Sequence, residues 1–200
     1  MPLQNRVQPD GSIIAHPARG RFMGNRGILH DDAQRLGRVR WRHKAWVTCL
    51  LAFKGRHRQI MRPNNYTELF FWDEAVAFAA GHRPCGECRR ADYNRFREAA
   101  GITTPIKLFD AALHADRAEP KTYRQRRHEA CIGDLPNGTF ILNDRGQPAL
   151  VLHDALLPYA PLGYSAPAPR PKTGTVTVLT PRLLIATLRD GYDLKIAVQD

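Results

Sequence analysis

Cys85 and Cys88 have the spacing of a metal-binding turn. Two residues separate them in the segment Arg83-Pro84-Cys85-Gly86-Glu87-Cys88-Arg89-Arg90. Two thiolates three positions apart in a tight turn can face one metal ion. Arginines flank the pair, and a nearby positive charge favours the thiolate form that a metal requires. We therefore expect a zinc ion here; a redox pair and two unrelated thiols are the alternatives.

The remaining ligands of a tetrahedral zinc site must come from elsewhere in the chain. Cys49 is the only cysteine upstream of the pair. We expect it to be the third ligand, the alternative being a buried cysteine in an apolar strand. Cys131 is expected to be a bystander. A histidine would complete the site: His30 and His57 rank equally, with His82 as a third choice. The ligand set that we predict is Cys49, Cys85, Cys88 and His30.

Strands and a helix around the cysteines would position them. Residues 46–53 are rich in apolar and β-favouring side chains, and together with residues 57–61 they predict a β-hairpin. Residues 67–72 predict a third strand. Asp73 is a good N-cap for an alanine-rich helix over residues 74–80. The cysteine turn would then follow this helix directly.

The rest of the chain predicts further helices and a second group of strands. Helices are expected over residues 89–100 and 106–118, and the basic stretch 117–128 is interpreted as either a helix or a mobile linker. A boundary is expected near residue 132, where the composition changes. Beyond it we expect strands at 139–142, 149–153, 175–179 and 194–198, a Pro-rich loop at 158–172 and a helix at 182–189.

These elements predict an α+β fold. Residues 1–44 would form an irregular basic arm, because they combine several glycines with dense arginine and little periodicity. Residues 45–131 would form a small zinc-stabilised module of a β-hairpin and a helix, with a helical extension. Residues 132–200 would form a small α+β or partly barrel-like module.

Positive charge is concentrated in the first third of the chain. The formal net charge is +11, and residues 1–62 carry 13 Lys and Arg against 3 acidic residues. Such asymmetry indicates an anionic partner, and nucleic acid is the leading candidate, with DNA ahead of RNA. The alternative is a solvated basic face without a partner. The residues expected to contact phosphates are Arg38, Arg40, Arg42, Lys44, Arg56, Arg58 and Arg62, with Trp41 and Trp46 as stacking platforms.

No segment approaches the roughly 20 apolar residues of a membrane span, and no signal peptide is recognisable at the N-terminus. We therefore expect a cytoplasmic protein that does not contact membranes. In the cytosol, the four cysteines favour metal binding over disulfides.

Residues 69–90 resemble the second half of the zinc domain of the Ada DNA-repair protein. In that domain a strand, an alanine-rich helix and an Arg-Pro-Cys-x-x-Cys turn follow one another in the same order. The resemblance implies a zinc-stabilised module and, in the Ada protein, a strand-borne cysteine that accepts a methyl group from a DNA phosphotriester. This chain departs from the pattern, because the family's upstream ligands come as a close pair and Cys49 stands alone.

Two enzymatic alternatives remain. The segment 84–89 also resembles the second zinc motif of cytidine deaminases, but no His-x-Glu or Cys-x-Glu precedes it, since the residue two before Glu68 is Tyr66. A zinc-dependent hydrolase or nuclease is the second alternative, with His30 as a base oriented by Asp31. We favour a binding protein over an enzyme: a zinc-containing protein that binds nucleic acid mainly through its backbone, in DNA repair or its regulation.

Overall fold

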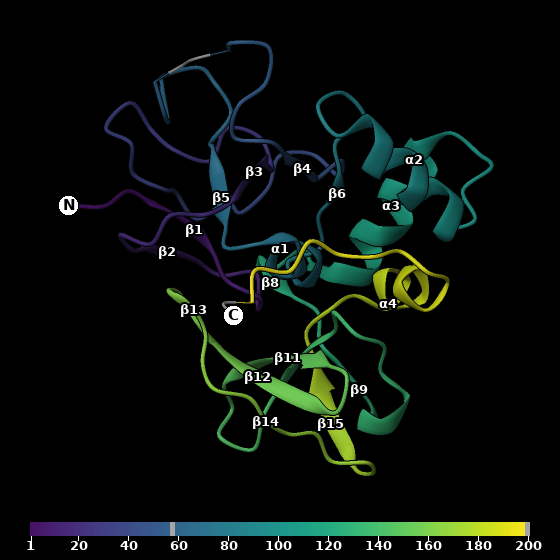
Figure 1. The fold of residues 1–200 in the computed structure, drawn as a ribbon. Coiled ribbons are helices and arrows are strands. Elements are labelled where there is room, and N and C mark those ends of the chain that lie inside the picture. Colours follow the sequence, from purple (N-terminus) through teal and green to yellow (C-terminus); the bar gives the residue numbers. More distant parts are fainter. Residues whose placement is uncertain (57–58, 199–200) are drawn as a thin grey trace.

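The computed structural model describes residues 1–56 and 59–198, and within them the chain adopts a mixed α+β fold (Figure 1). Most of the regular structure lies in two sheets, one formed by strands between residues 4 and 84 and one by residues after 127. Helices lie between and beside the sheets, as Figure 1 shows. Neither sheet closes into a barrel within the described residues. The α+β class is confirmed, and the partly barrel-like module was not formed.

The N-terminal sheet has six short strands in the order β2-β1-β5-β3-β4-β6. Strand β4 pairs antiparallel with β3 on one side and parallel with β6 on the other. Strand β4 therefore pairs with one strand that precedes it in the sequence and one that follows it. The strands are β1 (Gln4–Val7), β2 (Ile13–Ala15), β3 (Phe22–Asn25), β4 (Val47–Cys49), β5 (Leu69–Phe71) and β6 (Arg83–Pro84).

The predictions of a hairpin over residues 46–61 and of an irregular arm over residues 1–44 are both wrong. Residues 59–61 form no strand, and β3, from inside the supposed arm, takes the place beside β4. The glycines of residues 1–44 were interpreted as a sign of irregular structure, but Gly24 lies within strand β3. A Cβ there would lie 2.4 Å from the carbonyl oxygen of Val47 and 2.8 Å from the ring of Phe71. The missing side chain thus allows close packing inside the sheet.

Helix α1 (Glu74–Ala79) lies at the centre of the molecule, and all six of its residues are buried. Asp73 caps it as predicted: one carboxylate oxygen accepts a hydrogen bond from the backbone N–H of Val76 at 2.9 Å. Gly81 follows with φ of 80°, a left-handed conformation that ends a helix without strain. Strand β5 and α1 therefore follow the sequence-based expectation closely.

Two further helices lead into the second half of the chain. Helix α2 (Arg90–Ala99) directly follows the cysteine turn, and α3 (Ile106–Arg117) packs near it in Figure 1. Both were predicted. The basic stretch after α3 is neither helix nor mobile linker, since β7 (Ala118–Glu119) and β8 (Arg124–Gln125) pair as a short hairpin.

The C-terminal sheet follows the order β13-β12-β11-β10-β15-β9, with β14 paired to β12. The expected Pro-rich loop is interrupted by strands: the end of β12, β13 and β14 fall within residues 158–172, and prolines 158 and 169 occupy strand positions. Helix α4 (Arg182–Arg189) follows the sheet as predicted, with Pro181 at its N-cap. The other elements are β9 (His128–Cys131), the 3₁₀ helix η1 (Ile132–Asp134), β10 (Phe140–Leu142), β11 (Pro148–Leu152), β12 (Ala155–Ala160), β13 (Gly163–Tyr164), β14 (Ala168–Pro169) and β15 (Thr175–Val178).

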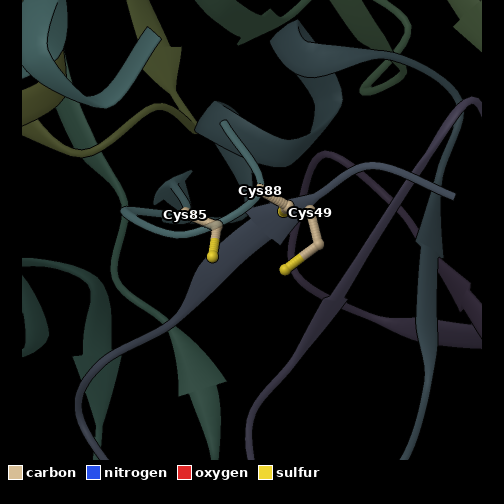
Figure 2. Close-up of side chains that lie close together, drawn as sticks. All are labelled: Cys49, Cys85 and Cys88. Atoms are coloured by element: carbon tan, nitrogen blue, oxygen red, sulfur yellow. The ribbon is translucent and has the colours of Figure 1, made fainter. Parts of the chain in front are cut away.

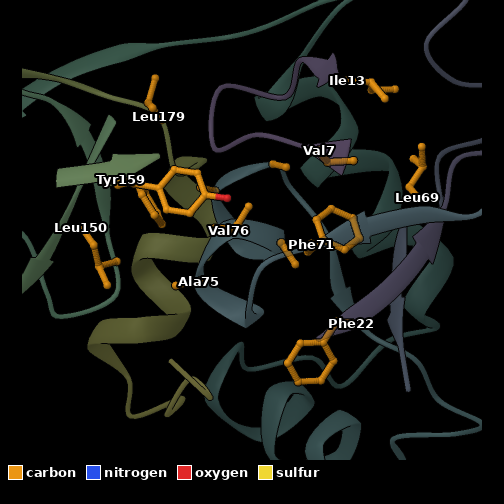
Figure 3. Close-up of a cluster of buried hydrophobic side chains, with 14 of the residues drawn as sticks. Val7, Ile13, Phe22, Leu69, Phe71, Ala75, Val76, Leu150, Tyr159 and Leu179 are labelled. Atoms are coloured by element: carbon orange, nitrogen blue, oxygen red, sulfur yellow. The ribbon is translucent and has the colours of Figure 1, made fainter. Parts of the chain in front are cut away.

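One hydrophobic core joins both sheets across α1 (Figure 3). Phe71 of the first sheet and Phe140 of the second are both fully buried members of this cluster, together with Val76 of α1. Burial of a side chain of this size contributes about 1.5–3 kcal/mol. The core therefore continues through the expected boundary near residue 132.

The last described segment is not the strand that we expected at residues 194–198. It runs across α1 and donates backbone hydrogen bonds to two buried carboxylates: Lys195 N–H to Glu74 at 3.0 Å and Ala197 N–H to Asp73 at 3.0 Å. Tyr164 donates to the same Asp73 carboxylate at 2.8 Å. These carboxylates thereby attach the C-terminal segment to the central helix.

Candidate functional site

Three of the predicted ligands come together in the structure. The sulfur atoms of Cys49, Cys85 and Cys88 all lie within 4.8 Å of one another and are partly buried. Figure 2 shows Cys49 at the end of a strand and the other two on the turn beside it. A cluster of three cysteines at this separation could hold a metal ion.

Backbone pairing explains why the two parts of the cluster meet. Strand β4 ends at Cys49, and it pairs in parallel with β6, which ends one residue before Cys85. The Cys85 N–H continues the ladder by donating to the carbonyl of Thr48 at 3.0 Å. Helix α2 then begins with a bond from Arg89 N–H to the Cys85 carbonyl at 3.2 Å. The turn is thus held at both ends by regular structure.

Buried ion pairs fix the residues on either side of the turn. Arg83 donates two hydrogen bonds to Asp110 of α3, both at 2.7 Å. Arg89 pairs with Glu74 of α1 and with Asp92. Bidentate arginine–carboxylate pairs are among the most directional of protein contacts. These arginines connect the turn to three helices.

Hydrogen bonds within the cluster, and not the flanking arginines, control thiol acidity. The hydrogen bond from Cys49 lowers the pKa of Cys85 to about 5, helped by the backbone N–H groups of Cys88 and Glu87. The same bond to Cys85, with burial, raises the pKa of Cys49, and burial raises that of Cys88. The Cys85 thiol is therefore the most acidic of the three in the metal-free cluster. The earlier attribution to arginine was wrong, because Arg83 and Arg89 are paired with carboxylates.

A cavity of about 510 Å³ adjoins the three cysteines. Glu68 lines it and is only 2% exposed. One of its carboxylate oxygens accepts a hydrogen bond from Met61 N–H at 2.7 Å, and the other has no hydrogen-bond partner among the described residues. Glu87 also lines the cavity but pairs with Arg56 at the surface at 2.7 Å. A buried carboxylate with one unpartnered oxygen thus lies in the wall of the cavity beside the thiols.

No fourth ligand joins the cluster within residues 1–56 and 59–198. The two ring nitrogens of His30 lie 2.6 Å from Thr67 Oγ1 and 3.3 Å from the Arg62 carbonyl. His82 is fully buried beside Trp46, and it accepts a hydrogen bond from Arg26 at 3.3 Å. His57 lies outside the described residues. The structure therefore brings three of the four predicted ligands together and leaves His30 apart from them.

The basic residues expected to contact phosphates are spread over several surfaces. Arg38 and Arg40 line a cavity of about 760 Å³, whereas Arg42 lines a different cavity. Arg56 is beside the cysteines. Lys44 and Arg62 are exposed, and Arg58 lies outside the described residues. The predicted residues thus do not share one cavity.

The 760 Å³ cavity contains arginines that we did not select from the sequence. Arg26 and Arg117 are buried in its wall, and Arg124 and Arg127 lie at the surface. Only a partial signal existed: the basic stretch 117–128 was visible, but nothing showed that it would fold back beside residues 38–41.

None of the helices in the described part of the chain is long and apolar enough to cross a membrane. Comparison with protein-family models, with curated proteins and with solved structures gave no significant match for this chain.

Proposed function

We propose that this chain is a zinc-containing protein that binds nucleic acid, DNA ahead of RNA, mainly through the phosphate backbone. The observation that carries the proposal is the convergence of Cys49, Cys85 and Cys88 within 4.8 Å. The order of strand, alanine-rich helix and cysteine turn, shared with the Ada zinc domain, supports a link to DNA repair.

The donor set fits zinc. Thiolates are soft ligands that favour Zn²⁺ over Mg²⁺ or Ca²⁺, and zinc sites are tetrahedral. Cys49, Cys85 and Cys88 would hold the ion, and it would supply a cross-link between β4 and the turn before α2. Without a metal ion, repulsion between neighbouring thiolates limits how many of the three thiols ionise. A divalent cation would offset this repulsion and allow all three to bind it as thiolates.

Surplus positive charge supports the nucleic-acid part. The chain carries a net charge of +11, and Arg38, Arg42 and Lys44 are exposed. Exposed cations gain free energy by releasing the counterions of a polyphosphate.

Elemental analysis tests the zinc site. The protein would be purified without added metal, and zinc per chain measured for the wild type, Cys49→Ser, Cys85→Ser and Cys131→Ser. We expect one zinc per chain in the wild type and in Cys131→Ser, whose thiol is exposed and outside the cluster. The Cys49 and Cys85 variants should lose it. Full zinc in these two variants, or none in the wild type, would contradict the proposal.

Salt dependence tests nucleic-acid binding. Affinity for duplex DNA should fall linearly with salt on logarithmic axes, with a slope of about −0.9 for each phosphate contacted. Arg38→Gln should reduce the slope by about 1. Absence of binding to any nucleic acid, or binding that does not weaken as salt rises, would refute this part.

A zinc-dependent hydrolase is the second candidate, and the unpartnered oxygen of Glu68 favours it. Zinc held by three protein ligands supplies Lewis acidity at its fourth position. Glu68 would accept a proton from the attacking nucleophile, since it lines the same cavity as the three cysteines. Hydrolysis of nucleic acid that is lost in Glu68→Gln, but retained in the exposed control Glu87→Gln, would support this role. Equal activity in both variants would exclude it.

A further inference from the structure

The cavity of about 760 Å³ lies where two basic parts of the chain meet. Residues 38–41 of the first part and the β7–β8 hairpin of the second form much of its wall. Two acidic residues, Asp10 and Glu119, also line it. The six arginines in the wall are Arg26, Arg38, Arg40, Arg117, Arg124 and Arg127.

Arg26 and Arg117 are buried without a carboxylate partner. They are 2% and 1% exposed, and neither forms an ion pair within the described residues. Burial lowers the pKa of Arg26 to about 9, with Arg40 lowering it further. Burial also lowers the pKa of Arg117 well below its ordinary value; Arg26 lowers it further, whereas Asp110 and Asp116 partly oppose the shift. Two like charges in a buried wall destabilise the fold unless something compensates them.

The compensation inside the protein is incomplete. Both guanidinium groups lie over the Trp46 ring, with their central carbons 4.1 Å and 3.8 Å from its centroid. Arg117 donates to the carbonyls of Gly81 and Lys44, but its Nε–H has no partner among the described residues. Carbonyl dipoles and a ring face stabilise a cation less than a carboxylate or a phosphate does. The site therefore favours an anion.

The acidic residues of the wall do not provide that anion. Asp10 lies 3.9 Å from Arg127 at the surface. Glu119 accepts a hydrogen bond from the Thr122 hydroxyl at 2.8 Å. Neither carboxylate bonds to Arg26 or Arg117. The hydrogen bonds of Arg26 go to His82 and to the carbonyls of Gly11 and Ala80, so no anionic group is bonded to either guanidinium.

Aromatic rings form another part of the wall. Trp41 and Tyr123 both line the cavity, with ring centroids 4.9 Å apart at an interplanar angle of 64°. Trp41 also contacts His114 and Trp46 at angles of 81° and 49°. None of these neighbours lies parallel to the Trp41 ring, and the residue is partly exposed. A planar ligand can therefore stack on it.

We propose that this cavity binds one nucleotide, with its phosphate on the arginines and its unpaired base stacked on Trp41. Arginine binds phosphate oxygens through paired N–H groups, and aromatic side chains bind bases through their faces. The volume lies within the roughly 300–1,000 Å³ of small-molecule sites. Binding of a nucleotide within a strand rests on the proposed function, whereas binding of a free mononucleotide does not.

Tryptophan fluorescence and calorimetry with the full chain test the ligand class. The probes are deoxyadenosine monophosphate, deoxyadenosine and inorganic phosphate, each titrated at constant salt. The monophosphate should bind most tightly, because it alone satisfies both the arginines and the ring. Equal affinity for inorganic phosphate would show a simple anion site and overturn the proposal, as would no binding of the monophosphate.

Variants separate the two contacts. Trp41→Ala should weaken binding of the monophosphate roughly tenfold and leave binding of inorganic phosphate unchanged. Arg124→Gln, at an exposed position, should weaken binding of both. Arg145→Gln is the matched control, because Arg145 is also exposed but lies outside the cavity. If Trp41→Ala proves misfolded by circular dichroism, Trp41→Phe, which keeps a stacking face, should bind the monophosphate nearly as the wild type does. No change in Trp41→Ala and Arg124→Gln would refute the site.

Single-stranded and duplex oligonucleotides distinguish this inference from the proposed function. Trp41→Ala should weaken binding of a single-stranded oligonucleotide and leave binding of a duplex unaffected, because paired bases cannot stack on the ring. Duplex binding together with no monophosphate binding would refute only the cavity. Monophosphate binding without binding of any polynucleotide would refute only the proposed function and identify a free nucleotide as the ligand.

Discussion

The cysteine cluster and the arginine cavity meet at one strand but differ in how their charges are balanced. Trp46 directly precedes β4 and Cys49 ends it. Side chains along an extended chain point alternately to opposite faces, so residues three positions apart face opposite sides. Trp46 lines the arginine cavity, and Cys49 lines the cavity beside the cysteines. The two cavities share no lining residue. A short segment thus contributes to two separate sites.

Arginines have opposite roles in the two regions. Near the cysteines, Arg56, Arg83 and Arg89 each pair with a carboxylate. In the other cavity, Arg26 and Arg117 have none among the described residues. The first region therefore lacks a cation to bind its thiolates, and the second lacks an anion. The comparison shows that an arginine count does not locate an anion site, whereas the pairing of each arginine does.

Removing metal should have the largest effect, and it should be confined to the cysteine side. Structural zinc contributes on the order of 10 kcal/mol of apparent binding free energy. A chelator should therefore increase amide hydrogen exchange in residues 47–49 and 83–89 while the β7–β8 hairpin keeps its protection. Uniform exchange over both regions would show that they do not behave separately.

Breaking the buried ion pair at the cysteine turn should have the next largest effect. Arg83→Ala leaves Asp110 buried without its partner, which costs about 3–5 kcal/mol of unfolding free energy. The control is Arg56→Ala, since the Arg56–Glu87 pair is exposed and its contribution to stability is small. Urea denaturation measures both. Similar losses in the two variants would contradict the distinction between buried and exposed pairs.

Anion binding should stabilise the arginine side. A ligand at about 100 times its dissociation constant raises the unfolding free energy by about 2.7 kcal/mol. Deoxyadenosine monophosphate should therefore raise the melting temperature of the wild type and of Cys131→Ser, and raise it less in Arg124→Gln. An equal shift in Arg124→Gln would place the ligand elsewhere.

Acid should weaken the wall of the arginine cavity, and this effect is the smallest. Burial holds the pKa of His82 well below 6.5 and lowers that of His114 to about 4. Below pH 6.5 the unfolded chain binds protons that the folded chain does not, so stability falls as pH falls. For the buried His82 the slope is at most about 1.4 kcal/mol per pH unit. Titration of the histidine ring protons by NMR should show both rings neutral at pH 6; a protonated His82 would contradict this.

Local signals predicted the parts of the fold that depend on neighbouring residues. Asp73, the alanines of α1 and Gly81 specify a helix with both ends defined, and α1 formed between them. The spacing of Cys85 and Cys88 is equally local. Cys49 was correctly grouped with them, because its apolar segment predicted a strand and the cysteines shared a chemistry.

Long-range pairing could not be predicted. Strand β3 is four residues long and contains a glycine, so its place beside β4 follows from packing against Phe71 and not from its own composition. The arginine cavity was missed for the same reason, since Arg26 and Arg117 are 91 positions apart in the sequence. Whether a charged residue is paired depends on contacts that periodicity does not report.

The attachment of the C-terminal segment to α1 has a consequence for biosynthesis. Asp73 and Glu74 are buried carboxylates whose hydrogen bonds come in part from the backbone of residues 195 and 197. These donors emerge from the ribosome more than 100 residues after the helix that needs them. The central helix therefore cannot reach its final hydrogen-bonded state until residues 195 and 197 have been synthesised. Nascent chains that stop before residue 195 should remain sensitive to protease.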